Sequence, residues 1–281
     1  MRRSRLVVPL LALALGASAC GGSGGSGSGG SSGGGKDAAL APAAVVRAAS
    51  ATSTKAGSSK FELDSSTVVQ GQPLTIKGAG LFDYGARKGS LTLTLPIGTV
   101  QQRVVDGKVY LALSQDPGHF YALPLDQVQG TSLGGSTDPS ASFAQLSAVE
   151  DGATKVGTEK VRGEDTTHYR GTLDVKKALS TTDATAKQIA AATLGRAGVD
   201  ELPFDAWIDS AGRLRRYVQV LEVPAGPTTG GQPVKSTTTL ELFDFGTKVD
   251  VVAPPASQIK DGAPLLAALK RQSAAVSGSG G

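Results

Sequence analysis

The feature that most constrains the fold is an alternation of apolar and polar residues that recurs through most of the chain. It is clearest in residues 202–223, LPFDAWIDSAGRLRRYVQVLEV. Because successive side chains of a β-strand point to opposite faces, this alternation predicts strands with one buried face. Asp209 and Gly212 bound a typical turn, since Asp bonds to nearby backbone amides and Gly accepts a positive φ. We therefore predict a β-hairpin here.

The same alternation assigns a face to each residue of the hairpin. The first strand has Leu202, Phe204, Ala206 and Ile208 on one face. The second strand has Leu214, Val218 and Val220 on one face and Arg213, Arg215, Tyr217 and Gln219 on the other. We expect Arg213 and Arg215 to face solvent, although with Arg216 they would also suit an anionic lipid headgroup. Trp207, the only tryptophan, is expected to pack in the sheet.

Further strands extend the pattern over most of the chain. They are predicted at 59–66, 74–77, 90–95, 99–105, 108–113, 154–162, 166–173 and 236–245, and Asp106-Gly107 predicts a tight hairpin turn. We therefore predict the α+β class, with a large curved antiparallel sheet of about nine to eleven strands and helices on one face. A sheet of this size curls or closes, and an apolar cavity remains where helices only partly fill its concave side.

Four helices are predicted around this sheet. The first covers 37–50, with Leu40, Val45 and Val46 as its apolar side. The second begins at Asp138-Pro139, an N-cap followed by proline, and places Phe143, Leu146 and Val149 on one face. The third runs from Ser180 to Leu194, and the fourth begins at Pro264, with Leu265, Leu266 and Leu269 directed inward.

The first 35 residues are predicted to serve export and anchoring. A basic start is followed by ten apolar residues at 6–15 and by small residues before Cys20, the only cysteine. A membrane-spanning helix needs about 20 apolar residues, so we predict a lipoprotein signal peptide at 1–19 and acylation of Cys20. A secreted protein that is cut near Ala19 is the alternative.

The rest of the chain is predicted to contain one folded domain. Residues 20–35 are almost entirely Gly and Ser after the cysteine, and this composition predicts a flexible tether. Motif-like glycine patterns in the tether lack the flanking strand and helix that a nucleotide site or a nucleophile elbow requires. Residues 36–276 are expected to form a single α+β domain, and 277–281 a disordered tail.

The charge balance argues against a nucleic-acid partner. Removing the arginines at positions 2, 3 and 5 from the 28 basic residues leaves 25, against 24 acidic residues. Such a chain has no basic field, and its one basic cluster, 213–216, is short.

The residues that catalysis needs are sparse. A triad or a zinc site from His119, His168 and a carboxylate such as Asp165 is conceivable, but the spacing matches no ligand pattern. Tyr110, Phe120 and Tyr121 flank the turn at 114–119, where they would line a cavity mouth or cap the sheet. We therefore predict a protein that is not an enzyme and has no metal and no cofactor.

Several segments carry a resemblance to a known family. They are "LPFDAWID..GRLRR", "DFG..VDV..PP", "VDGKVYLAL......FYALPL" and "VRGEDTTHYRGTLD". In this order and spacing, with a lipidated Cys20, they resemble the mycobacterial LppX/LprG-type lipoproteins, which have a LolA/LolB-like fold. The resemblance implies a half-open β-barrel with helices on its concave side, around a deep apolar cavity that holds lipid.

The resemblance also implies a function. Members carry triacylated glycolipids or related lipids toward the outer envelope of actinobacteria. We therefore expect a lipoprotein that is anchored on the extracytoplasmic face of the cell membrane, binds the acyl chains of a lipid or glycolipid, and has an envelope transporter as a possible partner. The implied cavity residues are Phe61, Leu63, Leu74, Ile76, Leu91, Leu93, Leu95, Val109, Leu111, Leu113, Phe204 and Ile208. The alternatives are a lipid-responsive sensor or partner-binding module, and a hydrolase that depends on one of the histidines.

Overall fold

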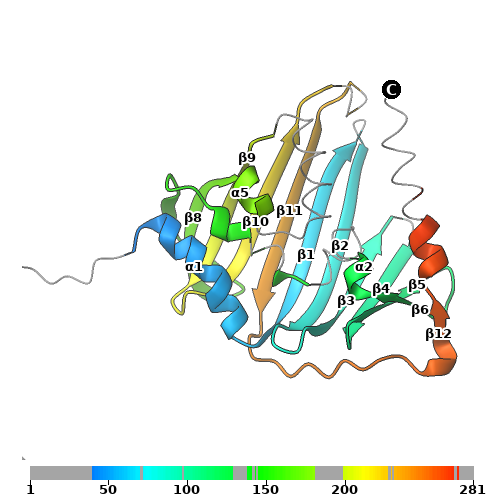
Figure 1. Ribbon diagram of the computed structural model, residues 1–281. Coiled ribbons are helices and arrows are strands. Elements are labelled where there is room, and N and C mark those ends of the chain that lie inside the picture. The colour runs from blue at the N-terminus through cyan, green and yellow to red at the C-terminus, as the bar shows by residue number, and fades with distance from the viewer. Residues whose placement is uncertain are drawn as a thin grey trace, which may run out of the picture. The chain divides into compact units, whose positions relative to one another are not determined.

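The described part of the chain is dominated by one large sheet. The computed structural model describes residues 40–69, 72–96, 98–128, 138–140, 143, 145–180, 199–226, 229, 231–268 and 271. Twelve strands of these residues pair into a single sheet (Figure 1). They are β1 (Ser58–Val69), β2 (Gln72–Asp83), β3 (Lys88–Leu95), β4 (Gly98–Val105), β5 (Lys108–Leu113), β6 (Phe120–Pro124), β7 (Thr154–Val161), β8 (Glu164–Asp174), β9 (Glu201–Asp209), β10 (Leu214–Val223), β11 (Val234–Phe243) and β12 (Ile259–Asp261).

The strand order is β12-β6-β5-β4-β3-β2-β1-β11-β10-β9-β8-β7. All neighbours are antiparallel except β12, which pairs with β6 in parallel. The order ends at β12 and β7, so the sheet does not close on itself. The predicted α+β class and the large curved antiparallel sheet are confirmed. The two strands beyond the predicted ten are β6 and β12. β12 has three residues, too few to show an alternation in the sequence.

The pairing of β1 with β11 joins the two halves of the sheet. β1, the first strand of the chain, pairs with β11, the last long one, over nine residue pairs from Lys60↔Phe243 to Val68↔Lys235. On either side, hairpins follow one another in sequence order. The turn between β4 and β5 is the predicted one, with positive φ at both Asp106 (51°) and Gly107 (71°), as a two-residue hairpin turn requires.

Helices pack on one side of the sheet. α1 (Pro42–Lys55) crosses β10 and contacts the segment around η1 (Gln145–Ala148). The buried residues of α1 are Ala43, Val46, Ala49 and Ser53, which lie three or four positions apart and therefore share a helix face. The prediction for Val46 is confirmed. Leu40 is 67% exposed, contrary to prediction, because the helix begins two residues after it.

Two polar contacts fix α1 to the domain. The Ser53 hydroxyl donates to the Ala49 carbonyl oxygen at 2.7 Å and accepts the backbone N–H of Leu214 at 2.9 Å. The Arg47 guanidinium donates to the carbonyl oxygen of Val149, at 2.6 Å from Nη2. These contacts satisfy backbone groups of Leu214 and Val149 and so hold the helix against both β10 and the segment after η1.

The other helices that the structure describes are short. They are α2 (Leu125–Val128), α5 (Val175–Ser180) and η3 (Ala256–Gln258), and residues 263–268 are also helical. The Asp138 carboxylate accepts the backbone N–H of Ser140 at 2.9 Å, as the predicted cap requires. Phe143, Leu146 and Val149 are all fully buried, as predicted. The predicted signal peptide, Cys20, the tether, the predicted helix at 180–194 beyond its first residue, Leu269 and the tail lie outside the described residues.

The faces of β10 differ from the prediction. The pairing shifts by one residue between Leu214 and Arg216, which is a β-bulge. Beyond it Tyr217 shares a face with Leu214, and Val218 and Val220 lie on the opposite face. The prediction that Arg215 faces solvent is therefore wrong, since it is 7% exposed.

Asp209 is the reason for this burial. Its Oδ2 accepts Nε of Arg215 at 2.8 Å and Nε of Arg213 at 2.9 Å, and its Oδ1 accepts two amides of the turn, from Ala211 and Arg213. Burial alone would raise the pKa of Asp209, but the Arg213 amide and the two guanidinium groups outweigh it, so the pKa is lowered. One carboxylate thus closes the turn and neutralises the bulge residue.

We predict that Asp209→Asn lowers the free energy of unfolding by about 3 kcal/mol at neutral pH, because it leaves the buried Arg215 charge with only Glu164, an exposed carboxylate 4.0 Å away, as an acidic partner. Since the folded-state pKa of Asp209 lies below the unfolded one, its stabilisation is complete above the ordinary Asp pKa of about 4 and is lost as pH falls through the folded value. The variant should therefore lose less stability than the wild type below about pH 4. Urea unfolding at several pH values measures both effects.

Asp244→Asn is the matched control. Asp244 pairs with Lys60 at 2.8 Å, with both side chains about half exposed. Exposed pairs contribute about 1 kcal/mol or less. Equal losses in the two variants would contradict the role given to Asp209.

Candidate functional site

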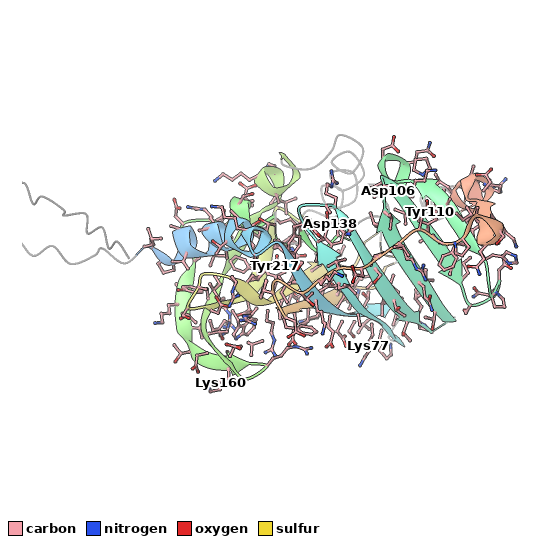
Figure 2. All side chains as sticks on the ribbon, turned by 90° about the horizontal axis from the view of Figure 1, so that it is seen from below. Lys77, Asp106, Tyr110, Asp138, Lys160 and Tyr217 are labelled. Carbon is pink, nitrogen blue, oxygen red and sulfur yellow. The ribbon has the colours of Figure 1, made fainter. Side chains whose placement is uncertain are left out.

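The two faces of the sheet differ in chemistry. We call the face that packs against α1 the inner face and the opposite one the outer face. In Figure 2, Tyr217 lies on the side of α1, and Lys77 points away from the other side. The strand registers place all twelve predicted cavity residues on the inner face. Their common face is thus established, and their contact with lipid stays a prediction.

These twelve residues differ in burial. Seven are buried, namely Phe61, Leu91, Leu93, Val109, Leu111, Phe204 and Ile208. Four others are half-buried, namely Leu63, Ile76, Leu95 and Leu113. The twelfth, Leu74, is 41% exposed. The buried members belong to cores that include α1, Phe143 and Leu146 on one side and Val128 and Leu266 on the other. The inner face is therefore a filled core at one end and accessible at the other.

The accessible part lies toward the tips of the β1–β2 and β10–β11 hairpins, at the upper end of these strands in Figure 1. We call it the half-buried section. It combines apolar and neutral polar side chains. Its members are Leu63, Leu74, Ile76, Leu95, Leu221, Val223, Ser65, Thr67, Gln219, Ser236 and Thr238.

Four polar members of the half-buried section pair with one another across strands, and the fifth, Gln219, bonds to a residue of η1. The hydroxyls of Ser65 and Thr238 lie 3.1 Å apart, and those of Thr67 and Ser236 lie 2.8 Å apart. The Gln219 amide donates to the Gln145 side-chain oxygen at 3.4 Å. This polar band was not predicted from the sequence. Its signal was the continuation of the β1 and β11 alternation with Ser and Thr in place of apolar residues.

The inner face carries no charged side chain over most of its described area. At the described inner-face positions of β1–β6 and β9–β11 there is no Asp, Glu, Lys, Arg or His. The charged residues of these strands lie on the outer face or at the bulge. Because a charge is costly to bury beside apolar groups, this segregation leaves the inner face suitable for an uncharged, apolar ligand.

Glycines shape the inner face of β2. A Cβ on Gly80 would lie 2.3 Å from the Ser90 carbonyl oxygen and 2.7 Å from Cζ of Phe61. At Gly78 it would lie 3.0 to 3.3 Å from three leucine side chains, so it would be tight there as well. Because Gly80 and Gly78 lack side chains, Phe61 and the neighbouring leucines can occupy the space beside β2.

We predict that Gly80→Ala lowers the free energy of unfolding by about 1–3 kcal/mol, because a new methyl group would displace Phe61 or the Ser90 backbone. Thermal and urea unfolding measure the loss. The control is Gly157→Ala on β7, where an added Cβ meets nothing within 4 Å. A Gly80→Ala variant as stable as the control would contradict this prediction, because it would show that the neighbours of β2 accommodate the methyl group at no cost in stability.

The outer face is held together by ion pairs. Arg162, in the β7–β8 turn, donates from Nε to Glu241 on β11 at 2.6 Å and from Nη2 to Glu62 on β1, and its guanidinium lies 4.0 Å from the Phe243 ring centroid. Arg216 donates to Glu241 at 2.7 Å. Burial raises the pKa of Glu241, and the two arginines lower it further than burial raises it. These contacts bring the edge hairpin to β1, five positions away in the strand order.

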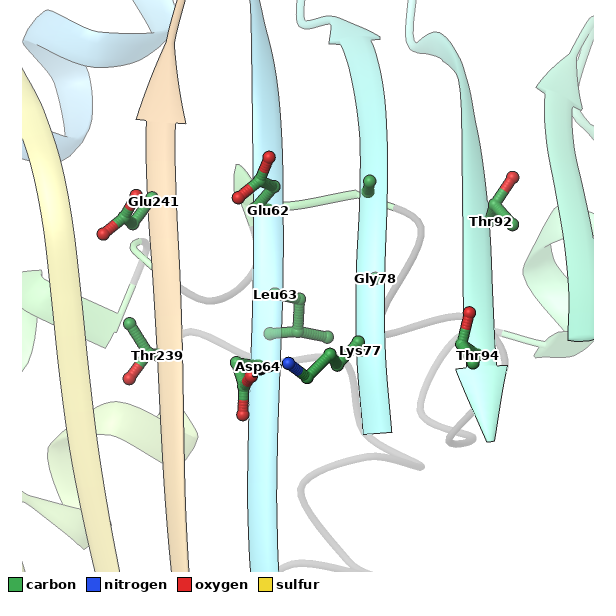
Figure 3. A pocket seen from close by; sticks show the side chains of 10 residues that line it. Glu62, Leu63, Asp64, Lys77, Gly78, Thr92, Thr94, Thr239 and Glu241 are labelled. Atoms are coloured by element: carbon green, nitrogen blue, oxygen red, sulfur yellow. Dashed lines mark ion pairs between the residues drawn. The ribbon is translucent and has the colours of Figure 1, made fainter. Parts of the chain in front are cut away.

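A groove of about 420 Å³ lies on the outer face over β11, β1, β2 and β3 (Figure 3). Its charged side chains include Glu62, Asp64, Lys77 and Glu241. Arg162 already occupies two of these carboxylates, and Lys77 lies 3.6 Å from Asp64. This groove carries charged side chains and lies on the face opposite the one to which the predicted cavity residues point.

The histidines do not come together. Nδ1 of His119 lies 2.9 Å from Asp116, before β6. His168, on β8, lies 2.6 Å from Asp205, and its ring stacks on Trp207 at 4.2 Å. β6 and β8 lie near opposite edges of the sheet, and Asp165 pairs with Lys160 at 2.7 Å. The conceivable site from His119, His168 and Asp165 is therefore not assembled.

Other predicted residues have structural partners. Trp207 packs in the sheet, as predicted, on its outer face, and donates from Nε1 to Glu159 at 2.6 Å. Tyr110 and Phe120 form a small outer-face core with Val105, and Tyr121 donates to Asp116 at 2.7 Å. Among the residues described, no group of three or more His, Cys, Asp or Glu is placed to hold a metal ion. None of the described helices is long and apolar enough to cross a membrane.

Comparisons with known proteins find relatives in sequence and similar solved structures. No protein-family profile matches the chain. It is 28% identical over 239 residues to an uncharacterised protein of Streptomyces griseus, a match that covers 73% of this chain and 74% of that protein. It is 27% identical over 240 residues to a predicted lipoprotein of Streptomyces coelicolor, over 75% of this chain and 72% of that protein.

The similar solved structures include mycobacterial lipoproteins. LprF from Mycobacterium bovis matches with a TM-score of 0.48 and 14% identity, over 76% of this chain and 97% of that one. The lipoprotein LppX of Mycobacterium tuberculosis matches with a TM-score of 0.44 and 16% identity, over 74% of this chain and 99% of that one. A LolA superfamily protein from Nitrosomonas europaea matches with a TM-score of 0.31. The resemblance predicted from the sequence is thus found again, while the fold itself rests on the strand pairing described above.

Proposed function

We propose that the protein is a membrane-anchored envelope lipoprotein that binds the acyl chains of a lipid or glycolipid on its inner face and carries them within or across the cell envelope. One observation carries this proposal. The described inner-face positions of β1–β6 and β9–β11 hold no charged side chain, whereas the outer face of the same strands is charged. Such segregation favours a ligand that is apolar along most of its length.

The thermodynamics of transfer suit a carrier. An acyl chain that leaves a bilayer for an apolar protein face exchanges one dry environment for another, so the net hydrophobic free energy is small. A small net free energy allows both loading and release. The predicted lipoprotein among the Streptomyces relatives supports an envelope location.

A charge on the inner face tests this function. Ile76 and Thr75 are neighbours on β2, and Ile76 is half-buried on the inner face while Thr75 is exposed on the outer face. We predict that Ile76→Lys lowers lipid occupancy more than tenfold, because the bound chain would desolvate an ammonium group. Thr75→Lys adds the same charge on the other face and should retain wild-type occupancy.

Native mass spectrometry of the full chain, after incubation with envelope lipids, measures the occupancy. A discrete added mass that organic extraction removes is the expected signal for the wild type and for Thr75→Lys. A wild-type chain that never retains lipid would falsify the carrier function. A stable complex with a membrane protein, altered by lipid, would favour the lipid-responsive sensor instead.

The anchor is tested separately at Cys20. Each buried methylene of an acyl chain contributes about 0.8 kcal/mol to membrane binding, so two or more chains hold a protein firmly. We predict that Cys20→Ser moves the protein from the membrane fraction to the soluble fraction, as measured by immunoblotting after cell fractionation. A Cys20→Ser variant that stays in the membrane fraction would show that another feature provides the anchor.

A further inference from the structure

One hydroxyl of the inner face has no hydrogen-bond partner among the described residues. It belongs to Tyr217, on β10, which is 3% exposed and whose hydroxyl oxygen is buried. The ring packs beside Phe204, with the centroids 6.1 Å apart. A buried hydroxyl that lacks a partner costs about 1–3 kcal/mol in stability. Such a group in a native fold calls for an explanation, and a role in binding is one that the structure can test.

Tyr84 provides the contrast within the same chain. Its hydroxyl lies 2.6 Å from the Ser59 hydroxyl, so its hydrogen-bonding capacity is used. Burial raises the pKa of Tyr84 to about 12 and also raises the pKa of Tyr217 above its usual value. Both phenols therefore stay protonated at neutral pH, and Tyr217 is left as a donor without an acceptor in the described part of the chain.

Tyr217 lies where the filled core meets the half-buried section. It is the last fully buried inner residue of β10, and Gln219 and the inner residues after it are half-buried. Gln219 lies opposite Thr238 in the register, and Thr238 opposite Ser65. The unpartnered hydroxyl is therefore at the deep end of the polar band.

An apolar row starts at the same point. Across the strands, the register continues from Tyr217 through Leu240, Leu63, Gly78, Leu93, Val100 and Leu113. Adjacent strands are about 4.8 Å apart, so the row from β10 to β5 spans roughly 29 Å. The row is apolar beyond Tyr217, with Tyr217, Leu240 and Leu93 buried in the core and Leu63, Val100 and Leu113 half-buried, so an acyl chain that follows it has to open the core packing beside Tyr217.

We propose that Tyr217 donates a hydrogen bond to the carbonyl oxygen of an acyl ester, and that the protein therefore selects ester-linked lipids over lipids with alkyl ether chains. This inference rests on the function proposed above and adds the chemical class of its ligand. The ester carbonyl accepts the bond, its acyl chain follows the apolar row, and the glycerol part lies over the neutral polar band.

The surroundings of Tyr217 favour an ester over an ionised acceptor. A free fatty acid or a phosphate would bring a negative charge to this depth. No Lys or Arg occupies a described inner-face position of β1–β6 or β9–β11, so such a charge would be buried without a counterion. A neutral carbonyl needs only the one donor that Tyr217 supplies.

An internal competition tests the proposal. The full chain with Cys20→Ser, freed of lipid by organic extraction and refolded, is incubated with vesicles that contain equal amounts of dioleoylglycerol and its dialkyl ether analogue. The two lipids differ in mass, so native mass spectrometry reports the occupancy by each in one sample. We expect the wild type to hold about three- to tenfold more of the ester, as one neutral hydrogen bond provides. Tyr217→Phe should hold equal amounts of both.

The melting temperature of the lipid-free protein adds a second readout with opposite signs for the two tyrosines. Tyr217→Phe removes an unsatisfied buried hydroxyl and should raise the melting temperature by about 2–4 °C. Tyr84→Phe leaves the buried Ser59 hydroxyl without this partner and should lower it, with the ester preference unchanged. A Tyr217→Phe variant that merely misfolds would not combine a raised melting temperature with the loss of the ester preference.

Each outcome decides between the two proposals. An ester preference that Tyr217→Phe abolishes supports the inference. Equal binding of ester and ether by the wild type overturns it while leaving the lipid-binding function intact. Loss of both lipids in Tyr217→Phe also overturns it, because the residue would then act through shape alone. If the wild type binds neither lipid, the proposed function itself is contradicted.

Discussion

The structure depends on keeping charge off one face of a very large sheet. Because a strand presents every second residue to the same face, a shift of one residue in any pairing would carry a row of charges into the core. The register of β1 against β11 is therefore the central constraint, since these strands are far apart in the sequence and join the two halves of the sheet. It places Phe61 opposite Leu242 inside and Glu62 opposite Glu241 outside. The two facing glutamates would repel each other, and Arg162 relieves this repulsion from the β7–β8 turn.

Much of the fold follows from local patterns in the sequence. Alternation located ten of the twelve strands, and Asp106-Gly107 located a turn, because these signals lie within a few residues of one another. The bulge at Arg215 has no such signal. It depends on Asp209, which closes the turn and accepts a bond from the arginine, so the exposed face expected for Arg215 becomes a buried ion pair. β12 was missed for a similar reason, since its three residues pair with a strand more than a hundred residues earlier.

The site was predictable in part. The apolar residues that the family resemblance implied all lie on one face, because alternation alone fixes that outcome once the strands are right. Alternation does not say which of them fill a core and which remain accessible. Phe61 and Leu91 are buried in the core to which α1 also contributes, whereas Ile76 and Leu95 are half-buried. That division depends on where the helices pack. Tyr217 was assigned to the polar face with Arg215, and only the bulge reverses its direction.

A carrier faces conflicting requirements that the inner face can reconcile. Apolar contacts alone give little discrimination, because one methylene differs from the next only in area. Ion pairs would discriminate well but would bind a charged headgroup too firmly for release. A single neutral hydrogen bond lies between these limits, since it is worth about 0.5–1.5 kcal/mol when made. A hydroxyl left without a partner in the empty protein sharpens this selectivity, because a ligand that offers only a weaker acceptor, such as an ether oxygen, relieves less of the cost of the buried donor. The cost that Tyr217 imposes on the empty fold is thereby the source of its selectivity for a ligand.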